Sequence, residues 1–477
     1  MNTTPEKLSL AVRLQERIAQ SRFFTFSLLL HVIIVTIAGG AVLFHRTPPA
    51  EDFAPPGELV KTDEPQKESE ILVATTLDPS PQPNPTPIAP PQTNSVITAN
   101  ISLTQPRLAL AMGAIKMPES LEHFDAGAGC EPIRIKIPPA IAGRLGGEAR
   151  RMAAAKTGGT EKSEKAVVAG LRWLKDHQNP DGSWSDEFKP AMTGLALLAF
   201  LGHGELPESP EFGPTVKRAL DWVLARGQEF DGRMSLTKDW GGNHGVYEHA
   251  ILTYAMGEYY SITHDERFEP VLKKAVGYIV DGQNPGGGWD YQYAKGPRND
   301  LSVAGWQIQA LKAAHLTGLA IPGVDEALDK AMPFLKKWQG NEGGFGYTAP
   351  ENRLSLTGVG VLCTYFWKES KDRTVKEGID FLLGKAEVKY KDGKAPADLY
   401  AWYYDTQACL MFGGSAWAKW NRMFQNEIAD SQSPDGSWPP TPGGHLQPKP
   451  AGAGPIYRTT LCVLMLEVFY RYSPINK

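Results

Sequence analysis

One unit recurs six times between about Lys165 and Ser473: an amphipathic helix, a turn rich in glutamine and glycine, and an apolar helix. The clearest turn runs from Gln178 to Trp184 and reads Gln-Asn-Pro-Asp-Gly-Ser-Trp. Self-similarity at a period of roughly fifty residues is typical of repeat architectures, in which each unit covers apolar surface of the next. The repeat therefore constrains the fold before any single residue suggests a function.

The turns keep a fixed step of six residues from glutamine to an aromatic residue. The copies are Gln178–Trp184, Gln283–Trp289, Gln339–Phe345 and Gln432–Trp438; Gln228–Met234 keeps the step without the aromatic, and the fifth copy, near Gly384–Asp392, has lost the signature. We expect the glutamine, at the end of the outer helix, to satisfy exposed backbone groups. Asp-Gly or Gly-Gly supplies the tight turn, and the aromatic packs under the neighbouring repeat. We therefore interpret these turns as structural rather than catalytic.

The first helix of each unit is amphipathic, whereas the second is apolar nearly all round and should be enclosed by the others. The expected outer helices are a first one around Ala166–Asp176, then Val216–Gly227, Pro270–Gly282, Asp325–Gln339, Thr374–Leu383 and Trp417–Ser431. The expected inner helices are Thr193–Leu201, Glu248–Tyr260, Ser302–Leu316, Leu356–Trp367, Asp405–Phe412 and Tyr457–Tyr472. Strict alternation predicts an all-α fold, a closed (α/α)6 toroid of six outer and six inner helices, which needs no polar capping repeat.

Residues 23–44 form an uncharged, mostly apolar run of about the length that crosses a bilayer as one helix. Basic residues precede it in the segment 1–22, and acids follow it, so the positive-inside rule predicts a cytoplasmic N-terminus. The chain is then a single-pass membrane protein whose toroid is extracytoplasmic (periplasmic). A cleavable signal peptide is the alternative, but the run is long for one and lacks a small-x-small cleavage site.

The segments between this run and the repeats read as a spacer and a lead-in. Residues 45–118 are proline-rich, which predicts an extended, semi-rigid linker. Residues 119–162 lead into the toroid at 163–477, and the basic stretch Gly143–Gly159 predicts a helix that packs on the first repeat.

Charge and cysteine spacing limit the classes of partner and of site that the chain can have. A formal net charge of −4 gives no nucleic-acid footprint. The cysteines, Cys130, Cys363, Cys409 and Cys462, lie far apart without a C-x-x-C spacing, and the last three fall in apolar helical stretches where we expect buried thiols.

Two resemblances to known families follow from these residues. Gly170, Leu174, Gln178, Gly182 and Trp184 form the QW motif of the squalene-cyclase and prenyltransferase β-subunit superfamily, which implies a toroid with an apolar central cavity suited to isoprenoid chains. The stretch Ser27-Leu-Leu-Leu-His31 before a proline-rich tract resembles the anchor of TonB-type energy-transducing proteins. That resemblance implies coupling of Ser27 and His31 to a proton-driven motor complex; a hydrogen bond of His31 within a helix pair is the plainer alternative.

The chain departs from both catalytic signatures of the superfamily. The Asp-x-Asp-Asp motif of the cyclases is missing, and in Trp402-Tyr-Tyr-Asp405-Thr a tyrosine stands where the proton donor would be. Asp300-Leu-Ser302 followed by Trp306 resembles the Asp-x-Cys zinc motif of the prenyltransferases, but serine is a poor zinc ligand. We therefore expect no metal and no other cofactor.

Polar and aromatic residues where the turns lead into the inner helices are the candidate site. The candidate catalytic residues are Asp405, Asp300, Glu248 and Asp239; the candidate cavity residues are Trp306, Tyr254, Tyr365, Trp402, Tyr404, Tyr457, His249 and Arg458. The same region holds His244, Asp290, Arg298, Asn352, Arg353 and Tyr403. Helix capping is the alternative role for Asp300 and Asp405, and core packing is the alternative for the aromatic residues.

The residues leave three functions open. One is a terpene-cyclase-like or prenyltransferase-like toroid that binds or transforms an isoprenoid or other apolar ligand; an active enzyme would be an isomerase (an intramolecular transferase) or a prenyltransferase. The second is a binding or scaffold domain coupled to a membrane complex. The third is an extracytoplasmic α/α barrel that acts on glycans.

Overall fold

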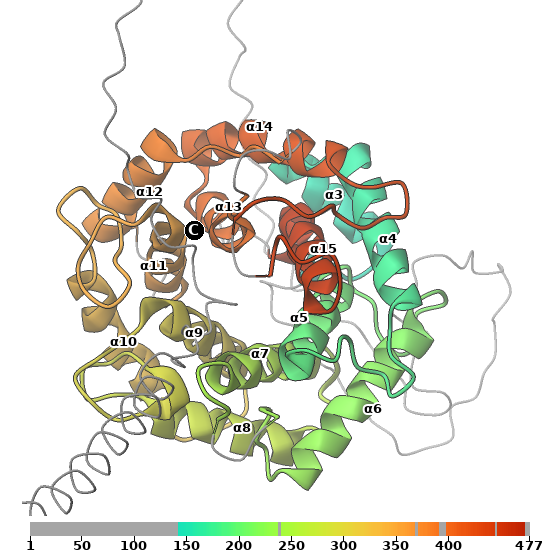
Figure 1. Cartoon of the computed structure of the whole chain (residues 1–477), viewed down its shortest axis with the longest axis horizontal. Helices are drawn as coiled ribbons and strands as arrows, with labels where there is room; N and C mark the ends of the chain where they lie inside the picture. Colours follow the sequence, from blue (N-terminus) through green and yellow to red (C-terminus); the bar gives the residue numbers. More distant parts are fainter. Residues whose placement is uncertain (1–141, 237–239, 368–370, 391–396, 444–445, 473–477) are drawn as a thin grey trace, which may run out of the picture. The chain divides into compact units, whose positions relative to one another are not determined.

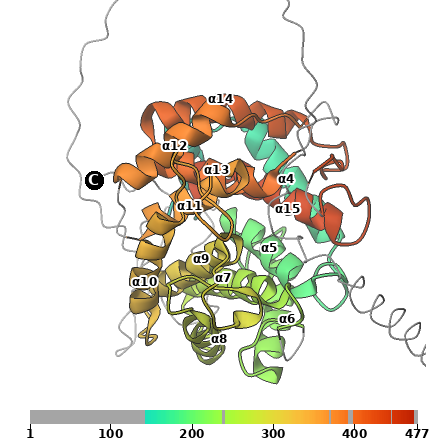
Figure 2. The ribbon, with the colours of Figure 1, turned by 60° about the vertical axis from the view of Figure 1, so that its left-hand side comes forward.

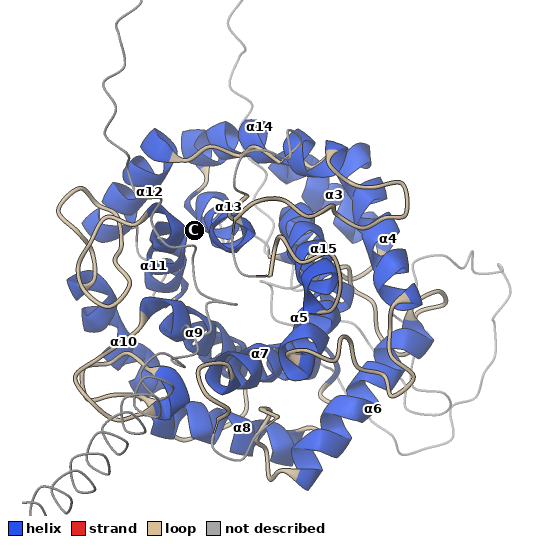
Figure 3. Cartoon of the chain, in the orientation of Figure 1, coloured by secondary structure: helices blue, strands red, loops and turns tan. Residues whose placement is uncertain are grey.

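The computed structural model describes residues 142–236, 240–367, 371–390, 397–443 and 446–472 of the 477-residue chain. Within these residues the structure holds helices and loops, with isolated bridges between residues 339, 345, 351 and 353 in place of strands (Figure 3). No helix in this described part combines the length and apolar run needed to cross a bilayer. The predicted span 23–44, with Ser27 and His31, and the linker 45–118 lie outside it.

Twelve of the described helices form two concentric rings (Figure 1). The outer ring consists of α4 (Glu161–Asp176), α6 (Gly213–Glu229), α8 (Glu269–Gly282), α10 (Val324–Lys337), α12 (Arg373–Lys385) and α14 (Gly414–Asp430). The inner ring consists of α5 (Lys189–Gly202), α7 (Gly245–Thr263), α9 (Leu301–Leu316), α11 (Leu354–Phe366), α13 (Leu399–Phe412) and α15 (Ala453–Leu466). This arrangement confirms the predicted α/α toroid, and the inner helices are buried on nearly every face because the outer ring encloses them.

The ring is closed, because the last repeat contacts the first. Helix α15 packs against α4 and α5, and α14 packs against α4. The turn after α14 is also hydrogen-bonded to α4, since Gln432 Nε2 donates to the Ala166 carbonyl at 2.8 Å. Figure 2 shows the same two layers after a rotation of 60°.

Each complete turn makes the same set of hydrogen bonds. The glutamine amide donates to the glycine carbonyl of its own turn and to a carbonyl near the start of the next outer helix. The pairs are Gln178 with Gly182 and Thr215, Gln283 with Gly287 and Ala327, Gln339 with Gly343 and Thr374, and Gln432 with Gly436 and Ala166, all at 2.7–3.0 Å. The glycines have φ between 91° and 95°, which only glycine adopts readily.

The aromatic residue of the turn secures the end of its own outer helix. The indole nitrogens of Trp184, Trp289 and Trp438 donate to the carbonyls of Leu174, Ile279 and Ile428 at 2.7–2.8 Å. The structural interpretation of the turns is thus confirmed, because each glutamine satisfies exposed backbone carbonyls. The tryptophan bonds to the end of its own outer helix, and the glutamine amide reaches the next repeat.

Two inner helices differ from the prediction. Helix α13 begins at Leu399 rather than at Asp405, because Asp398 caps it by accepting the Ala401 backbone N–H at 3.0 Å. The last inner helix is divided at Glu467 into α15 and the short α16 (Val468–Arg471). Cys363, Cys409 and Cys462 are free and buried, as predicted.

The lead-in helix α3 (Gly147–Thr157) follows the prediction and extends it. It contacts the first repeat, where Arg150 Nη1 donates to the His203 carbonyl at 2.8 Å. It also contacts the last repeat, where the Thr157 hydroxyl donates to the Phe469 carbonyl at 2.9 Å. The lead-in therefore lies across the seam where the ring closes.

Candidate functional site at the N-terminal ends of the inner helices

Asp300 caps helix α9 and is fully buried. Its Oδ1 accepts the backbone N–H groups of Ser302 and Val303 at 3.0 and 3.2 Å. The capping role proposed from the sequence is confirmed for Asp300, and the cap places its carboxylate at the end of the inner ring.

Ser302 connects Asp300 to two tyrosines of other repeats. Its hydroxyl donates to Asp300 Oδ1 at 2.6 Å, so the Tyr247 hydroxyl at 2.7 Å must donate to Ser302. Tyr400 Oη donates to the Ser302 carbonyl at 3.4 Å. The result is a buried relay from Tyr247 through Ser302 to Asp300 that ties α7, α9 and α13 together.

The solvent-facing part of this cluster is built around Arg298. Its Nη2 lies 3.0 Å from Asp300 Oδ2, and its Nη1 is paired with Asp290. The guanidinium carbon lies 4.9 Å from the centre of the Tyr291 ring, and the Tyr291 hydroxyl is hydrogen-bonded to that of Tyr347. The Arg298 side chain is 41% exposed, so it is the charged group of the cluster that solvent reaches.

The phenols of this cluster stay protonated at neutral pH. Burial, followed by the negative charge of Asp300, raises the pKa of Tyr347 to about 12 and that of Tyr247 well above its ordinary value. Burial raises the pKa of Asp300 as well, against the Ser302 hydrogen bond and the Arg298 charge, which lower it. The cluster is therefore a set of neutral hydroxyl donors and one guanidinium around an anchored carboxyl.

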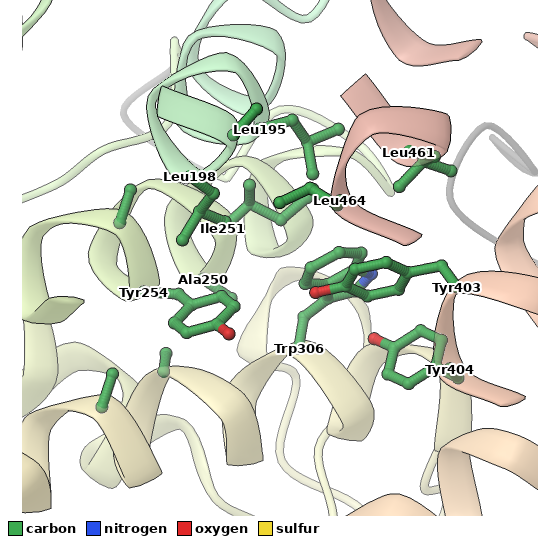
Figure 4. Close-up of a cluster of buried hydrophobic side chains, with 14 of the residues drawn as sticks. Leu195, Leu198, Ala250, Ile251, Tyr254, Trp306, Tyr403, Tyr404, Leu461 and Leu464 are labelled. Carbon is green, nitrogen blue, oxygen red and sulfur yellow. The ribbon is translucent and has the colours of Figure 1, made fainter. Parts of the chain in front are cut away.

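An aromatic layer lies further along the same inner helices (Figure 4). Trp306 of α9 stacks on Tyr403 of α13 with ring centroids 5.6 Å apart and meets Tyr404 edge-on at the same distance. Gln309 accepts the Tyr403 hydroxyl at 3.2 Å and donates to the Tyr404 hydroxyl at 2.9 Å. Because α11 lies between α9 and α13 in the ring, these side chains join two inner helices that are not neighbours.

Leucine and isoleucine side chains from α5, α7 and α15 complete this layer. Leu195, Leu198, Ile251, Leu461 and Leu464 point toward the aromatic rings in Figure 4, and all are at most 1% exposed. Trp306 and Tyr404, predicted as cavity residues, and Tyr403 therefore share one apolar environment.

The prediction that Asp405 caps a helix is wrong. Asp405 lies in the middle of α13, is 1% exposed, and packs so closely on Gly358 of α11 that a side chain there would collide with its carboxyl. Burial raises the pKa of Asp405 well above its ordinary value, and the charge of Asp398 adds to this. Burial raises the pKa of Asp398 to about 7. Asp405 is thus a neutral carboxylic acid packed between the inner helices α11 and α13, and unlike Asp300 it does not cap a helix.

The side chains of three further candidates form hydrogen bonds with the backbone. Glu248 Oε2 accepts the Leu236 N–H at 3.0 Å, and burial raises its pKa to about 6. His249 was predicted to line the cavity, but its ring bridges the Met234 N–H and the Ala275 carbonyl, between α7 and the outer helix α8. Arg458 was placed there too, but it donates to the carbonyls of Trp438, Gln447 and Lys449 in the loop before α15.

The remaining candidates lie in different parts of the toroid. The aromatic candidates Tyr365, Trp402 and Tyr457 are buried in α11, α13 and α15. Asn352 and Arg353 form hydrogen bonds within their own turn, and the His244 ring centre lies 4.5 Å from that of Phe188. Asp239 lies outside the described residues. Tyr254, a predicted cavity residue, lies in the same cluster as Trp306 and Tyr403 (Figure 4). Its hydroxyl is bonded to a second cluster toward the opposite ends of the inner helices.

That second cluster is a buried ion network. Glu258 Oε2 pairs with Arg144 at 2.6 Å, and its Oε1 accepts the Tyr472 hydroxyl at 2.6 Å. Arg471 Nη2 donates to the Tyr254 hydroxyl at 3.0 Å. Burial alone would raise the pKa of Glu258, but the charges of Arg144 and Arg471 hold it at about 2. The C-terminal ends of the inner helices are thus filled by paired charges, whereas the N-terminal ends keep hydroxyl groups near solvent.

No family model matches the sequence of this chain, and no curated protein does. Among solved structures, it is similar to the GH76A α-1,6-mannanase of Salegentibacter sp. HEL1_6, at 10% identity over 65% of this chain and 98% of that chain, with a TM-score of 0.48. It is also similar to the type II terpene cyclase MstE of Scytonema, at 15% identity over 65% and 98%, with a TM-score of 0.42. Neither likeness is close enough to assign a family or an activity.

The sequence reasoning missed most of the tyrosines at this site. Two lie in the first turns of α7 and α13, Tyr247 and Tyr400, and two lie in the turns that lead into α9 and α11, Tyr291 and Tyr347. Their common position in these segments was an available signal. Across the described ranges, no group of three or more histidine, cysteine, aspartate and glutamate residues is placed to hold a metal ion.

Proposed function

We propose that the toroid binds an amphiphile whose apolar, isoprenoid-like part lies against Trp306, Tyr403 and Tyr404 and whose oxygen-bearing end meets the Asp300 cluster. The observation that carries this proposal is the order of groups along α9. Its cap, Asp300, and Ser302 present polar groups at the end of the ring, and Trp306 lies one turn further in. One helix thus offers a polar and an apolar contact in the right order for an amphiphile.

The ligand's polar end should be neutral or singly charged. Arg298 already shares its charge between Asp290 and Asp300, which leaves little for a strongly anionic group. The Tyr291 and Tyr347 side chains are half-buried and their hydroxyls are hydrogen-bonded to each other, so their oxygens can accept from a ligand hydroxyl. Further in, the buried Trp306 indole N–H has no hydrogen-bond partner among the described residues, so the aromatic layer offers a donor.

Binding is better supported than cyclisation initiated by protonation of an alkene. Such a reaction needs a strong acid that faces the substrate, whereas the pKa of Asp405 is raised and its carboxyl packs on Gly358. Asp300 accepts hydrogen bonds from every described group around it. We therefore propose a binding toroid and keep catalysis as the outcome of a test.

The test is incubation of the purified full-length chain with squalene, farnesyl diphosphate and geranylgeraniol, followed by mass spectrometry of products and of lipid retained by the protein. We expect geranylgeraniol to be retained and no product to form. Trp306→Ala should abolish retention, whereas Trp222→Ala, a change on the outer helix α6, should not. Equal retention by both variants, or none by the wild type, would refute the proposal.

A glycan is the second candidate ligand. The specific observation is the Asp290–Arg298–Asp300 arrangement at the solvent-facing end, with the Tyr291 ring against the guanidinium. A pair of carboxyl groups beside an aromatic ring is also suited to a sugar. Oligosaccharides should then protect Tyr291 from chemical modification, and release of shorter products would make this candidate the better one.

The cellular placement is likewise a proposal, and it rests on the sequence alone. An anchor at residues 23–44 would hold the toroid outside the cytoplasm, and Ser27 and His31 would couple it to a proton-channel complex. Protease added to intact cells with a permeabilised outer envelope should cleave the toroid. Protection in this assay would contradict the placement, and unchanged recovery of channel subunits with His31→Ala would contradict the coupling.

A further inference from the structure

A guanidinium from the lead-in segment is wholly buried in the C-terminal end of the inner ring. Arg144 precedes α3, and its side chain is 0% exposed. Its Nη1 donates to Glu258 of α7 at 2.6 Å and to the Leu201 carbonyl of α5 at 3.2 Å. Gly204 makes this approach possible, since a side chain there would collide with the Arg144 carbonyl.

The same segment also bonds to the last repeat. Trp417 of α14 donates its indole N–H to the Thr157 carbonyl at 2.6 Å, and Gln425 donates to the Gly158 carbonyl at 2.8 Å. Together with the Thr157–Phe469 bond, these contacts join the first repeat to the last across the closing seam. We call residues 142–159 the strap.

The strap is connected to the aromatic layer through buried contacts. Glu258, held by Arg144, accepts the Tyr472 hydroxyl at 2.6 Å, and that hydroxyl contacts the hydroxyl of Tyr254. Arg471 donates to Tyr254 at 3.0 Å, and Tyr254 lies in the same buried cluster as Trp306 and Tyr403 (Figure 4). Tyr403 stacks on Trp306.

Several buried polar groups of the docked strap and of the helices around it lack hydrogen-bond partners. Nε and Nη2 of Arg144, Nε and Nη1 of Arg471 and both carboxyl oxygens of Glu467 are buried without a hydrogen-bond partner among the described residues. These groups would bond to water if the network opened, so the docked state is less stable than its direct contacts suggest. Such a network can have two arrangements, docked and open.

We propose that the strap is a latch. Docking of Arg144 closes the C-terminal end of the ring and holds the side chains of the aromatic layer in place. Withdrawal of Arg144 opens that end and weakens ligand binding. The second half rests on the proposed function; the first does not. Because residues 1–141 precede the strap in the sequence, a load or a partner acting on that part of the chain would act first on Arg144. By linkage, a bound ligand would in turn hold the strap docked.

Hydrogen exchange on the full-length chain tests the latch. Arg144→Met should raise exchange at least tenfold in α3, in α16 and in the C-terminal turns of α5 and α7, with the first turns of α7 and α9 unchanged. The double variant Arg144→Met/Glu258→Gln also removes the charge of the buried carboxyl that has lost Arg144 and keeps the chain folded; it should show the same pattern. Arg151→Met, an exposed change on α3, is the matched control. Wild-type exchange in the double variant, or a uniform increase along all inner helices, overturns the latch.

Geranylgeraniol titration, followed by native mass spectrometry, tests the coupling. The dissociation constant should rise roughly tenfold in the double variant and not in Arg151→Met. An unchanged constant together with opened exchange overturns the coupling and leaves the proposed function standing. Failure of the wild type to bind overturns the proposed function and the coupling, and the exchange pattern still decides the latch.

Discussion

The two ends of the inner ring use the same residue types in opposite ways. At the N-terminal ends, Arg298 is 41% exposed and holds two carboxylates beside tyrosine hydroxyls. At the C-terminal ends, Arg144 is 0% exposed and pairs with a carboxylate that is itself 4% exposed. An arginine in water can still meet a ligand, whereas a buried one can only hold the fold. Under the proposed function, ligands would therefore approach from the N-terminal side, and the strap would close the other side.

The largest effect that this contrast predicts is on stability. Arg144→Met leaves Glu258 buried without its nearest partner, which should lower the free energy of unfolding by roughly 3–5 kcal/mol. Urea denaturation of the full-length chain measures it. Arg151→Met should change the free energy of unfolding by less than about 0.5 kcal/mol. A similar loss in both variants would contradict the claim that the buried Arg144 stabilises the fold more than an exposed arginine does.

Acid should destabilise the two ends in separate steps, because α7 carries a titrating group at each. Burial, aided by the charge of Arg233, lowers the pKa of His249 from 6.5 to about 4, so folding favours the neutral ring. That contribution is complete above pH 6.5 and is lost as pH falls toward 4. Glu258, with its pKa lowered from 4.5 to about 2, favours folding when ionised, and its contribution is lost between pH 4.5 and 2.

Each of the two groups contributes roughly 3 kcal/mol at about 1.4 kcal/mol per pKa unit. Glu248 offsets part of the His249 step, because burial raises its pKa from 4.5 to about 6 and its protonation therefore favours folding as pH falls through 6. Hydrogen exchange as a function of pH should show the first turns of α7 opening before its last turns. His249→Gln should remove the first step and Glu258→Gln the second. Simultaneous loss of protection at both ends would show that the ends are one cooperative unit and would break the comparison.

A smaller effect is expected for the relay at the N-terminal end. Tyr247→Phe removes one hydrogen bond to Ser302 but leaves the Ser302–Asp300 bond in place. We expect a loss of about 1 kcal/mol of stability and a moderate loss of geranylgeraniol affinity. Val246→Ala, on the adjacent position of α7, is the control for stability without loss of the hydroxyl; an equal affinity loss there would argue against the relay.

The smallest stability effect is expected for Arg298→Gln, the counterpart of Arg144→Met. Because Arg298 is largely in water, its loss should cost no more than about 1 kcal/mol, while Asp300 keeps its bonds to Ser302 and Val303. Thermal denaturation gives this number, and the same samples give ligand affinity. A loss as large as that of Arg144→Met would erase the distinction between the two ends.

The toroid could be predicted from the sequence because its signals are local. The glutamine-to-tryptophan step and the amphipathic outer helices lie within single repeats, and the structure keeps them. The start of α13 was missed because its first turn, Leu399 to Trp402, carries no glutamine or glycine signal, and only the Asp398 cap marks it.

The site was only partly predictable, for a different physical reason. Asp300 and Trp306 share one helix, so their proximity follows from spacing. Tyr247 and Ser302 are 55 residues apart in the sequence, and Arg144 and Glu258 are 114 residues apart. No local sequence pattern therefore predicts either contact. Glu258 and Arg471 did offer a clue, since each is a charged residue within an apolar helical stretch, where an unpaired charge is costly.

The most direct measurement is photocrosslinking of the full-length chain with a geranylgeraniol that carries a diazirine on its isoprenoid chain. Peptide mapping should place the label on α9 and α13, near Trp306 and Tyr403, and excess unlabelled geranylgeraniol should compete it away. Label confined to the outer helices or to the C-terminal turns of α5 and α7, or label that resists competition, would contradict a ligand site that opens at the N-terminal ends of the inner ring.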